Sequence, residues 1–216
     1  MNPVAAAWSY ALANQHALAT GAGRHLGLSA AALGVAALLC IPLGVWTARH
    51  RAGATIIGVV TALRSVPSLA VLALMLPLLG LGFAPALVAL VLLAIPPILI
   101  NTDIGYRSVD RAAIEAAVGM GMRPAQVLRR VETPLAAPVI VTGLRTAAVE
   151  VIASATLAAF IGGGGLGDLI VGGLENDNGG ELLLGAACVA LLALAAEALF
   201  SGLGRLLSAP SLREQT

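Results

Sequence analysis

The residues of this chain that could do chemistry are a few charged side chains inside long apolar runs. Arg64 lies within one such run, and Arg145 and Glu150 lie within another. A charge at the centre of a bilayer costs at least about 2.5–3.5 kcal/mol, so these groups should face the protein interior and find partners. We expect Glu150 to pair with Arg64 or Arg145. Two roles stay open: a buried ion pair that fixes helix packing, or a pathway where a guanidinium and a carboxylate meet the two ends of a zwitterion.

The composition explains why these charges must lie in a membrane. The chain has 216 residues, of which 59% are hydrophobic and 11% are charged, and its mean hydropathy is +0.95. Soluble domains carry roughly 25% charged residues, so this chain lacks the charge to cover a wetted surface. The formal net charge of +1 gives no indication of nucleic-acid binding. We therefore predict an all-α polytopic membrane protein.

About five transmembrane helices follow from the apolar runs, since each span needs roughly 20 residues. We expect these spans at about 26–46, 54–79, 84–101, 137–161 and 181–203. The second should be a single helix kinked at Pro67, and Pro96-Pro97 should kink the third, because proline removes a backbone donor and clashes one turn back. Asp103 and Glu197 lie toward span ends, where we expect them to reach water.

The distribution of arginines gives the orientation. With the N-terminus outside and the C-terminus inside, nine of the twelve arginines face the cytoplasm, as the positive-inside rule requires. They are Arg49, Arg51, Arg107, Arg111, Arg123, Arg129, Arg130, Arg205 and Arg213. We divide the chain into an N-terminal interfacial segment (1–24), a transmembrane domain (25–204) and a cytoplasmic tail (205–216). The expected location is the bacterial cytoplasmic (inner) membrane, as a multi-pass protein.

The longest charged segment, about 107–134, should leave the bilayer as two short helices. Helix formers at 109–118 predict the first, and Gly119 and Gly121 should end it. Pro124 suits the first turn of a second helix, which Pro134 and Pro138 should end before the fourth span. Such an elbow could fit a partner's cleft as a rigid knob.

Within this elbow, Glu115-Ala116-Ala117 is followed by Gly121, Val131 and Pro134. This spacing resembles the EAA loop of bacterial ABC importer permeases. The resemblance implies a type I, methionine-permease-like fold and docking of a cytoplasmic ABC ATPase, in two copies, against the loop. ATP would be bound by that partner, with no cofactor in this chain. The family usually has Ile and Leu where this chain has Val131 and Thr133, so Thr133 is expected to weaken packing of the second short helix.

Further matches cover about residues 25–203. The stretches His25-Leu26-Gly27-Leu28-Ser29, Ser65-Val66-Pro67-Ser68-Leu69 and Ala155 to Gly167 are similar to the permeases of glycine betaine, carnitine, choline and proline betaine importers. Members of that subgroup work with the ATPase, a second permease (a homologue or a second copy) and an external substrate-binding protein. Permeases of methionine-type amino-acid importers share the size and the loop, and remain the alternative.

A run of four glycines ends the fourth span on the outer side. Gly162, Gly164 and Gly167 formally satisfy GxGxxG, but a dinucleotide site needs a strand and a βαβ unit, for which the sequence gives no sign. We expect pliable backbone here. Gly162, Gly163, Gly164 and Gly165, with Arg64, Ser65, Pro67, Arg145 and Glu150, form our candidate translocation path or gate; a passive loop is the alternative for the glycines.

No catalytic constellation is visible, and the three histidines are scattered with no metal-ligand spacing. We therefore predict a non-catalytic membrane subunit. The seven aromatic side chains are spread over termini and span ends, which disfavours a cation–π cage for a quaternary ammonium. Substrate affinity should reside mostly in the binding protein. An ATP-independent channel or carrier, and a membrane scaffold, are the alternatives from other classes.

Overall fold

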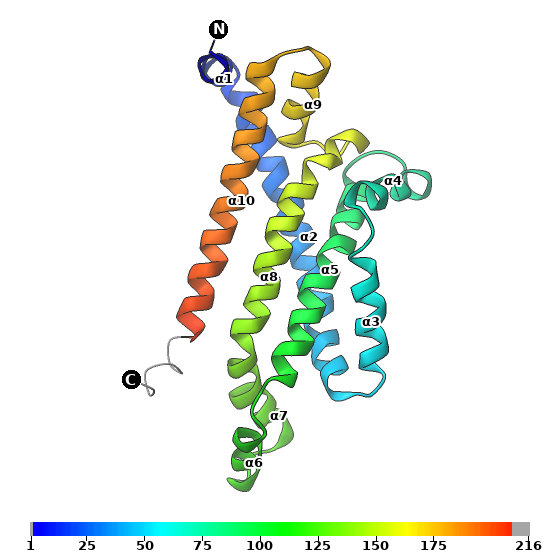
Figure 1. The fold of residues 1–216 in the computed structure, drawn as a ribbon, viewed down its shortest axis with the longest axis vertical. Helices are drawn as coiled ribbons and strands as arrows, with labels where there is room; N and C mark the ends of the chain where they lie inside the picture. The colour runs from blue at the N-terminus through cyan, green and yellow to red at the C-terminus, as the bar shows by residue number, and fades with distance from the viewer. Residues whose placement is uncertain (1, 209–216) are drawn as a thin grey trace. The chain divides into compact units, whose positions relative to one another are not determined.

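The computed structural model describes residues 2–208, which form helices and no strands (Figure 1). The α-helices are α1 (Pro3–Ala13), α2 (Gln15–Arg49), α3 (Gly53–Leu63), α4 (Ser68–Leu79), α5 (Phe83–Arg107), α6 (Arg111–Gly119), α7 (Pro124–Val127), α8 (Thr133–Ala155), α9 (Gly167–Glu175) and α10 (Gly179–Ser208). A π-helical turn, Leu128–Glu132, joins α7 to α8, and a 3-10 turn, Leu157–Ile161, follows α8.

Among the described residues, four helical segments are long and apolar enough to cross a membrane. They are Gln15–Arg49, Phe83–Arg107, Pro124–Ala155 and Gly179–Leu207. The bent pair α3 and α4 would make a fifth span if it crosses as one. The all-α, multi-pass prediction of about five spans is therefore confirmed. The division at 24 and 204 and the orientation remain predictions, and 209–216 of the predicted tail lie outside the described residues.

The second span differs from the kinked single helix that we predicted. Its two halves meet at 96° across residues 64–67, so it is a broken span or a re-entrant segment. Pro67 adopts φ −59° and ψ 136°, an extended conformation that cannot continue a helix. The proline thus separates two helices, because no continuous hydrogen-bond ladder passes through it.

The first and third spans are longer than predicted. Helix α2 begins at Gln15, so His25 lies inside it and is fully buried. Helix α5 continues through Pro96-Pro97 to Arg107. The carbonyl of Pro97 accepts a hydrogen bond from the Asn101 side chain at 2.8 Å.

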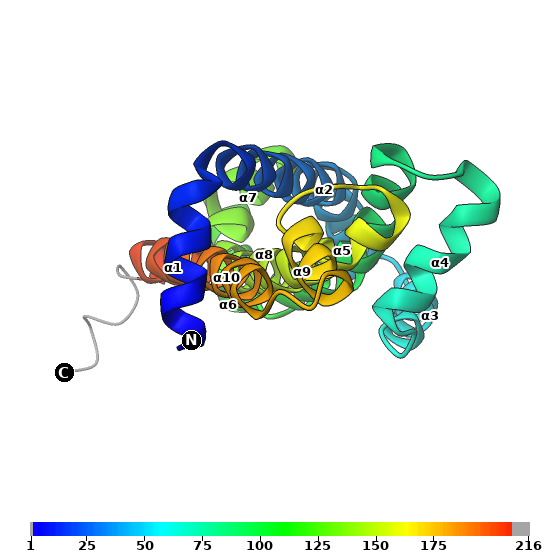
Figure 2. The same cartoon turned by 90° about the horizontal axis from the view of Figure 1, so that it is seen from above.

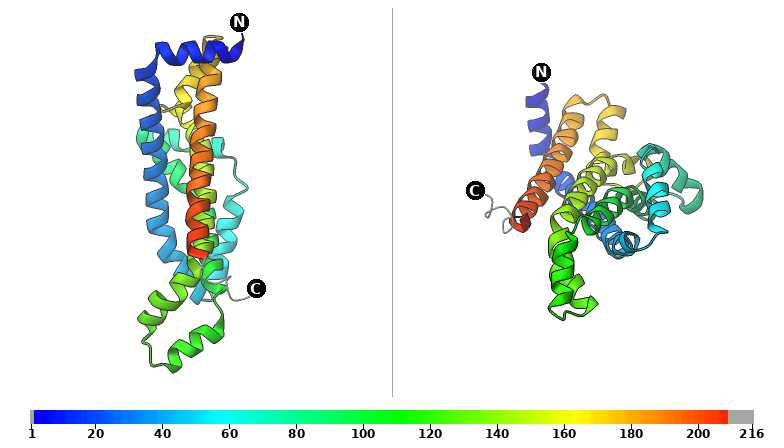
Figure 3. Two further views of the ribbon diagram at one scale, coloured as in Figure 1. Left: turned by 90° about the vertical axis from the view of Figure 1, so that its left-hand side faces the viewer. Right: turned by 60° about the horizontal axis from the view of Figure 1, so that its bottom comes forward.

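The described chain divides into two compact units, which we describe separately. The glycine unit comprises residues up to 36, 66–94 and 148–196. In the glycine unit, α1 lies across the N-terminal ends of α2 and α10 (Figure 2). It makes a steep angle with α2 (Figure 3). A Cβ on Gly180 would lie 2.9 Å from the carbonyl carbon of Ala6, so a glycine is needed where α10 meets α1. The buried cluster of the glycine unit includes Ile152, Leu166 and Val189.

The elbow unit comprises 37–65, 95–147 and the part of the chain from 197 onward. Its buried cluster consists of Tyr106, Val109, Ala136 and Ile140, against which Ile41, Val45 and Leu144 pack. Small residues bring the helices together: a Cβ on Gly143 would lie 2.7 Å from the Pro97 carbonyl oxygen. Close backbone approach at glycine is typical of helix packing in membranes.

Candidate functional site

The elbow has the two short helices that its glycines and prolines predicted. Asp110 caps α6 by accepting a hydrogen bond from the Ala112 amide at 2.9 Å. Gly121 turns the chain with φ +81°, a conformation that favours glycine. Pro124 then opens α7, and the Gln126 side chain accepts from the Arg123 amide at 2.8 Å. Each helix end therefore has a defined cap or turn.

The elbow presents one face and buries another. Ala117 and Val127 are buried, whereas Glu115 and Ala116 are exposed. Val118 and Met120 are also exposed, at 58% and 72%. The right-hand view of Figure 3 shows the two short helices projecting from the ends of α5 and α8. A carboxylate beside exposed apolar side chains gives this surface the composition of a docking site.

The end of the elbow differs from our prediction that Pro134 and Pro138 stop the second helix. The chain instead passes from α7 through the π turn into α8 without a break, and Pro134 and Pro138 lie within α8, Pro134 in its first turn. Val131 lies half-buried in the π turn, and Pro134 is exposed.

Thr133 strengthens the local structure, contrary to our expectation. Its hydroxyl donates to the Leu128 carbonyl at 2.7 Å and lies 2.9 Å from the Tyr106 hydroxyl. Since the Thr133 proton is used toward Leu128, Tyr106 donates to Thr133. The polar residue at this position therefore closes the π turn and ties it to α5.

An ion pair between Arg49 and Glu132 joins the end of α2 to the elbow. The Glu132 side chain is 13% exposed and the Arg49 side chain is 40% exposed, so the carboxylate is shielded from solvent and the guanidinium is partly open to it. Both residues line a cavity of about 280 Å³, with Ile114, Val118, Met122, Pro124 and Val127. The elbow is thus fixed to a transmembrane helix by a charge contact as well as by apolar packing.

A second charge pair lies nearby, in the last turn of α5. Arg107 donates from Nε to Asp103 at 2.7 Å and from its guanidinium to the Thr47 carbonyl at 2.8 Å. Asp103 is buried, with 5% of its surface exposed, so our expectation that it reaches water was wrong. Arg107 brings the partner charge to Asp103 instead and connects α5 to α2.

The charges that we assigned to the path lie in different surroundings. Arg145 pairs with Glu197 of α10 at 3.4 Å, so Glu197 is an ion-pair partner as well as partly exposed. Glu150 is half-buried in the glycine unit, and its pairing with Arg64 or Arg145 remains a prediction.

Arg64 follows α3 and is exposed with Ser65 and Pro67. The expectation that Arg64 faces the interior was therefore wrong for the single chain. The break before Pro67 places its cation at a helix C-terminus, which the helix dipole favours.

The glycine run is a packed turn, where we expected pliable backbone. Gly162, Gly164 and Gly165 have φ between +74° and +105°, and all of the run except Gly162 is buried. A Cβ on Gly163 would lie 2.9 Å from the Cβ atoms of Ala158 and Ala86. Neighbouring backbone and alanine side chains therefore fill the space that a side chain would need.

His25 supports this turn, and our sequence analysis missed it. Its Nε2 donates to the Ile152 carbonyl at 3.0 Å, and a Cβ on Gly165 would lie 3.2 Å from its Nδ1. The only signal was a histidine at the start of an apolar run. Beside it, partial burial raises the pKa of the Asp168 carboxyl, and the charge of Arg24 opposes that shift. Arg24 and Asp168 line a cavity of about 280 Å³ with Gly165.

The long apolar helices indicate a multi-pass membrane protein, from which the capped elbow projects with an exposed surface. Comparison with known families gives its class. The chain belongs to the family of inner membrane components of binding-protein-dependent transport systems, whose sequence model matches residues 40–213.

Several characterised relatives are similar over most of their length. The choline transport system permease protein OpuBB of Bacillus subtilis is 47% identical over 79% of this chain and 79% of its own. The carnitine transport permease protein OpuCB of Listeria monocytogenes is 45% identical, with 93% of each chain covered. The osmoprotectant import permease protein OsmW of Salmonella typhimurium is 41% identical over 86% of this chain and 89% of its own.

The fold matches a solved transporter. A chain of the inward-facing MetNI methionine ABC transporter superposes with a TM-score of 0.79, covering 89% of this chain and 97% of that one. At 21% identity, this likeness confirms the type I ABC importer fold and carries nothing about substrate.

Proposed function

We propose that the chain is the permease subunit of an ATP-driven importer for osmoprotectants such as glycine betaine, choline, carnitine or proline betaine. The single observation that carries the substrate class is the set of permeases at 41–47% identity whose names specify choline, carnitine or osmoprotectant transport. The likeness to the methionine transporter is at 21% identity, below the range where substrate is transferable.

The partner at the elbow is a cytoplasmic ABC ATPase, in two copies per transporter. Glu115, Ala116 and exposed apolar side chains form the contact surface, and Gly121 sets the angle between its helices. The Arg49–Glu132 pair transmits movement of the elbow to α2. Closure of the ATPases on ATP would then shift the permease between its conformations. This chain contributes the rigid lever, and the ATPase contributes the chemistry.

A second permease, homologous or identical, completes the pore. The path-facing groups are Glu150, the Arg64–Pro67 break and the glycine turn at Gly162–Gly165. Two roles were left open for Arg145, a structural ion pair and a group that lines the path. Its ion pair with Glu197 supports the structural role, in which it holds α8 against α10. The glycine turn would serve as an outer gate or as the contact with the substrate-binding protein.

Uptake in cells that express the whole transport system tests the substrate class. Radiolabelled glycine betaine, choline and methionine are supplied in parallel, with a strain lacking this permease as the control. We expect permease-dependent uptake of at least one quaternary ammonium compound and none of methionine, and loss of that uptake on ATP depletion. Uptake of methionine alone would show that the chain is the permease of an amino-acid importer. Uptake that survives ATP depletion would support a carrier instead.

A further inference from the structure

The largest cavity described in the elbow unit lies between α8 and α10, away from the elbow itself. It has a volume of about 520 Å³ and is lined by Pro138, Val139, Val141, Thr142, Arg145, Phe200, Ser201, Gly204 and Arg205. Of these residues, only Arg145 was assigned to the translocation path, and Pro138 was described only as part of α8. The cavity therefore asks for a separate explanation.

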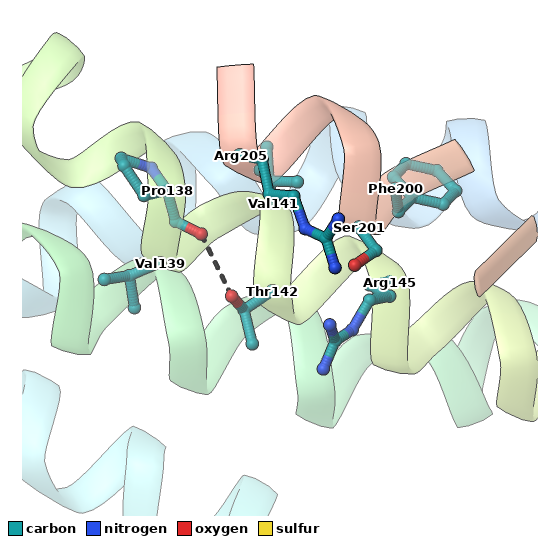
Figure 4. A pocket seen from close by; sticks show the side chains of 9 residues that line it. Pro138, Val139, Val141, Thr142, Arg145, Phe200, Ser201 and Arg205 are labelled. Carbon is teal, nitrogen blue, oxygen red and sulfur yellow. Dashed lines mark hydrogen bonds between the residues drawn. The ribbon is translucent and has the colours of Figure 1, made fainter. Parts of the chain in front are cut away.

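Two guanidinium groups give the cavity a positive charge. Figure 4 shows Arg205 extending from the last turn of α10 toward Ser201, and Arg145 extending from α8 back toward Thr142. Glu197 offsets the charge of Arg145 at 3.4 Å. Arg205 forms no ion pair with residues 2–208, so the described residues give the site one net positive charge. The Ser201 hydroxyl adds a donor beside it.

The surroundings of these cations are those of a lipid-facing groove. Valine, proline and phenylalanine side chains form the rest of the lining. Helix α10 is the least buried of the spanning helices, with 11% of its most apolar window buried. Leu199, Leu203 and Leu206 on it are exposed. Under the predicted orientation, Arg205 lies at the cytoplasmic end of the last span, at the level of the inner-leaflet headgroups.

We propose that this cavity binds the phosphate of an anionic phospholipid of the inner leaflet. Arg205 and Ser201 would hold the phosphate oxygens, Arg145 would add charge from deeper in the groove, and an acyl chain would lie along Val139, Val141 and Phe200. A guanidinium binds phosphate through paired charge-assisted hydrogen bonds. Basic pockets between transmembrane helices on the cytoplasmic side are a recognised form of lipid site. The bound lipid would bridge α8 and α10.

Native mass spectrometry of the detergent-purified transporter tests this site. Dioleoyl phosphatidylglycerol and dioleoyl phosphatidylcholine are titrated separately, and the lipid-bound population is measured. We expect Arg205→Gln to weaken phosphatidylglycerol binding about tenfold, because the variant loses a charge-assisted hydrogen bond to the phosphate. Arg51→Gln removes an exposed arginine from the loop after α2 and is the matched control, with no expected effect.

A second variant fills the cavity without changing its charge. A Cβ on Gly204 would lie 3.8 Å from Val141, so Gly204→Leu places a side chain in the groove without a backbone clash. We expect it to reduce phosphatidylglycerol binding as well. Equal losses in Arg205→Gln and Arg51→Gln, or full binding in Gly204→Leu, would overturn the proposal. So would equal binding of phosphatidylcholine, or displacement of the lipid by excess inorganic phosphate, which would indicate a site for a free anion.

Discussion

The elbow and the glycine turn are built in opposite ways. The elbow carries caps, hydrogen bonds and the Arg49–Glu132 pair on its inner side, and leaves Glu115 and Met120 exposed. The glycine turn has almost no side chains, and most of its backbone is buried against neighbouring atoms. The elbow therefore keeps its shape through specific bonds and offers a surface. The turn keeps its shape because a Cβ on Gly163 would clash and because Gly162, Gly164 and Gly165 adopt positive φ angles, which favour glycine.

This difference predicts how each region responds to substitution. Changes on the exposed elbow face should impair transport while the protein still folds. Changes in the glycine turn should impair folding itself, because a closely packed backbone cannot yield without moving its neighbours. Bonds on the inner side of the elbow should lie between these extremes.

The largest effect on stability is expected for Gly167→Ala, immediately after the glycine turn. Its Cβ would lie 2.2 Å from the Thr156 carbonyl oxygen, and this overpacking should cost about 1–3 kcal/mol. Gly27→Ala is the control, since its Cβ would have no atom within 4 Å. Thermal unfolding in detergent should show a lower melting temperature for Gly167→Ala only. A melting temperature equal to that of Gly27→Ala would mean that the turn is not tightly packed.

A smaller effect is expected when the elbow loses its anchor. Arg49→Gln or Glu132→Gln should each cost about 1 kcal/mol, because the remaining charge loses its partner, and should lower uptake. The double variant Arg49→Glu/Glu132→Arg restores an ion pair of reversed direction. Recovery of both stability and uptake would show that the pair anchors the elbow. Losses in this double variant equal to the sum of those in Arg49→Glu and Glu132→Arg would exclude a direct interaction.

The smallest effect is expected at the π turn. Thr133→Val removes hydrogen bonds to Leu128 and Tyr106, and should cost about 0.5–1.5 kcal/mol. Thr146→Val, on an exposed position of α8, loses only a bond within its own helix and should cost less. The double variant Tyr106→Phe/Thr133→Val should lose little more stability than Thr133→Val alone, because both changes remove the same hydrogen bond between the two hydroxyls. Additive losses of stability in the double variant would mean that the two hydroxyls do not bond each other.

The sequence predicted the features that depend on local backbone chemistry. Gly121 indicated the turn between the short helices and Pro124 the start of the second, because conformational freedom and a fixed φ are properties of single residues. The apolar runs likewise predicted the spans, although helix ends such as Gln15 and Arg107 lay well beyond the runs. Helices extend past the hydrocarbon thickness when other contacts cover their ends.

Features that depend on distant partners could not be predicted. Nothing in the sequence pairs Arg145 with Glu197. The Asp103–Arg107 pair is local, four residues apart, and was missed because the predicted span ended at about residue 101. Thr133 was judged by its polarity alone, and its partner Tyr106 lies on another helix. The glycine run was predicted to be flexible, because several of the residues that pack against it, such as Arg24 and His25 of α2 and Ala86 of α5, are distant in the sequence.

The central claim is that the elbow couples transport to an ATPase through an exposed surface that the fold does not need. Proteoliposomes containing the whole transporter test it, with ATP-driven glycine betaine uptake and the melting temperature measured for wild type and Glu115→Lys. We predict at least tenfold lower uptake, equivalent to about 1.4 kcal/mol of coupling, at an unchanged melting temperature. Wild-type uptake in Glu115→Lys would contradict the claim, and so would an uptake loss that is fully explained by unfolding.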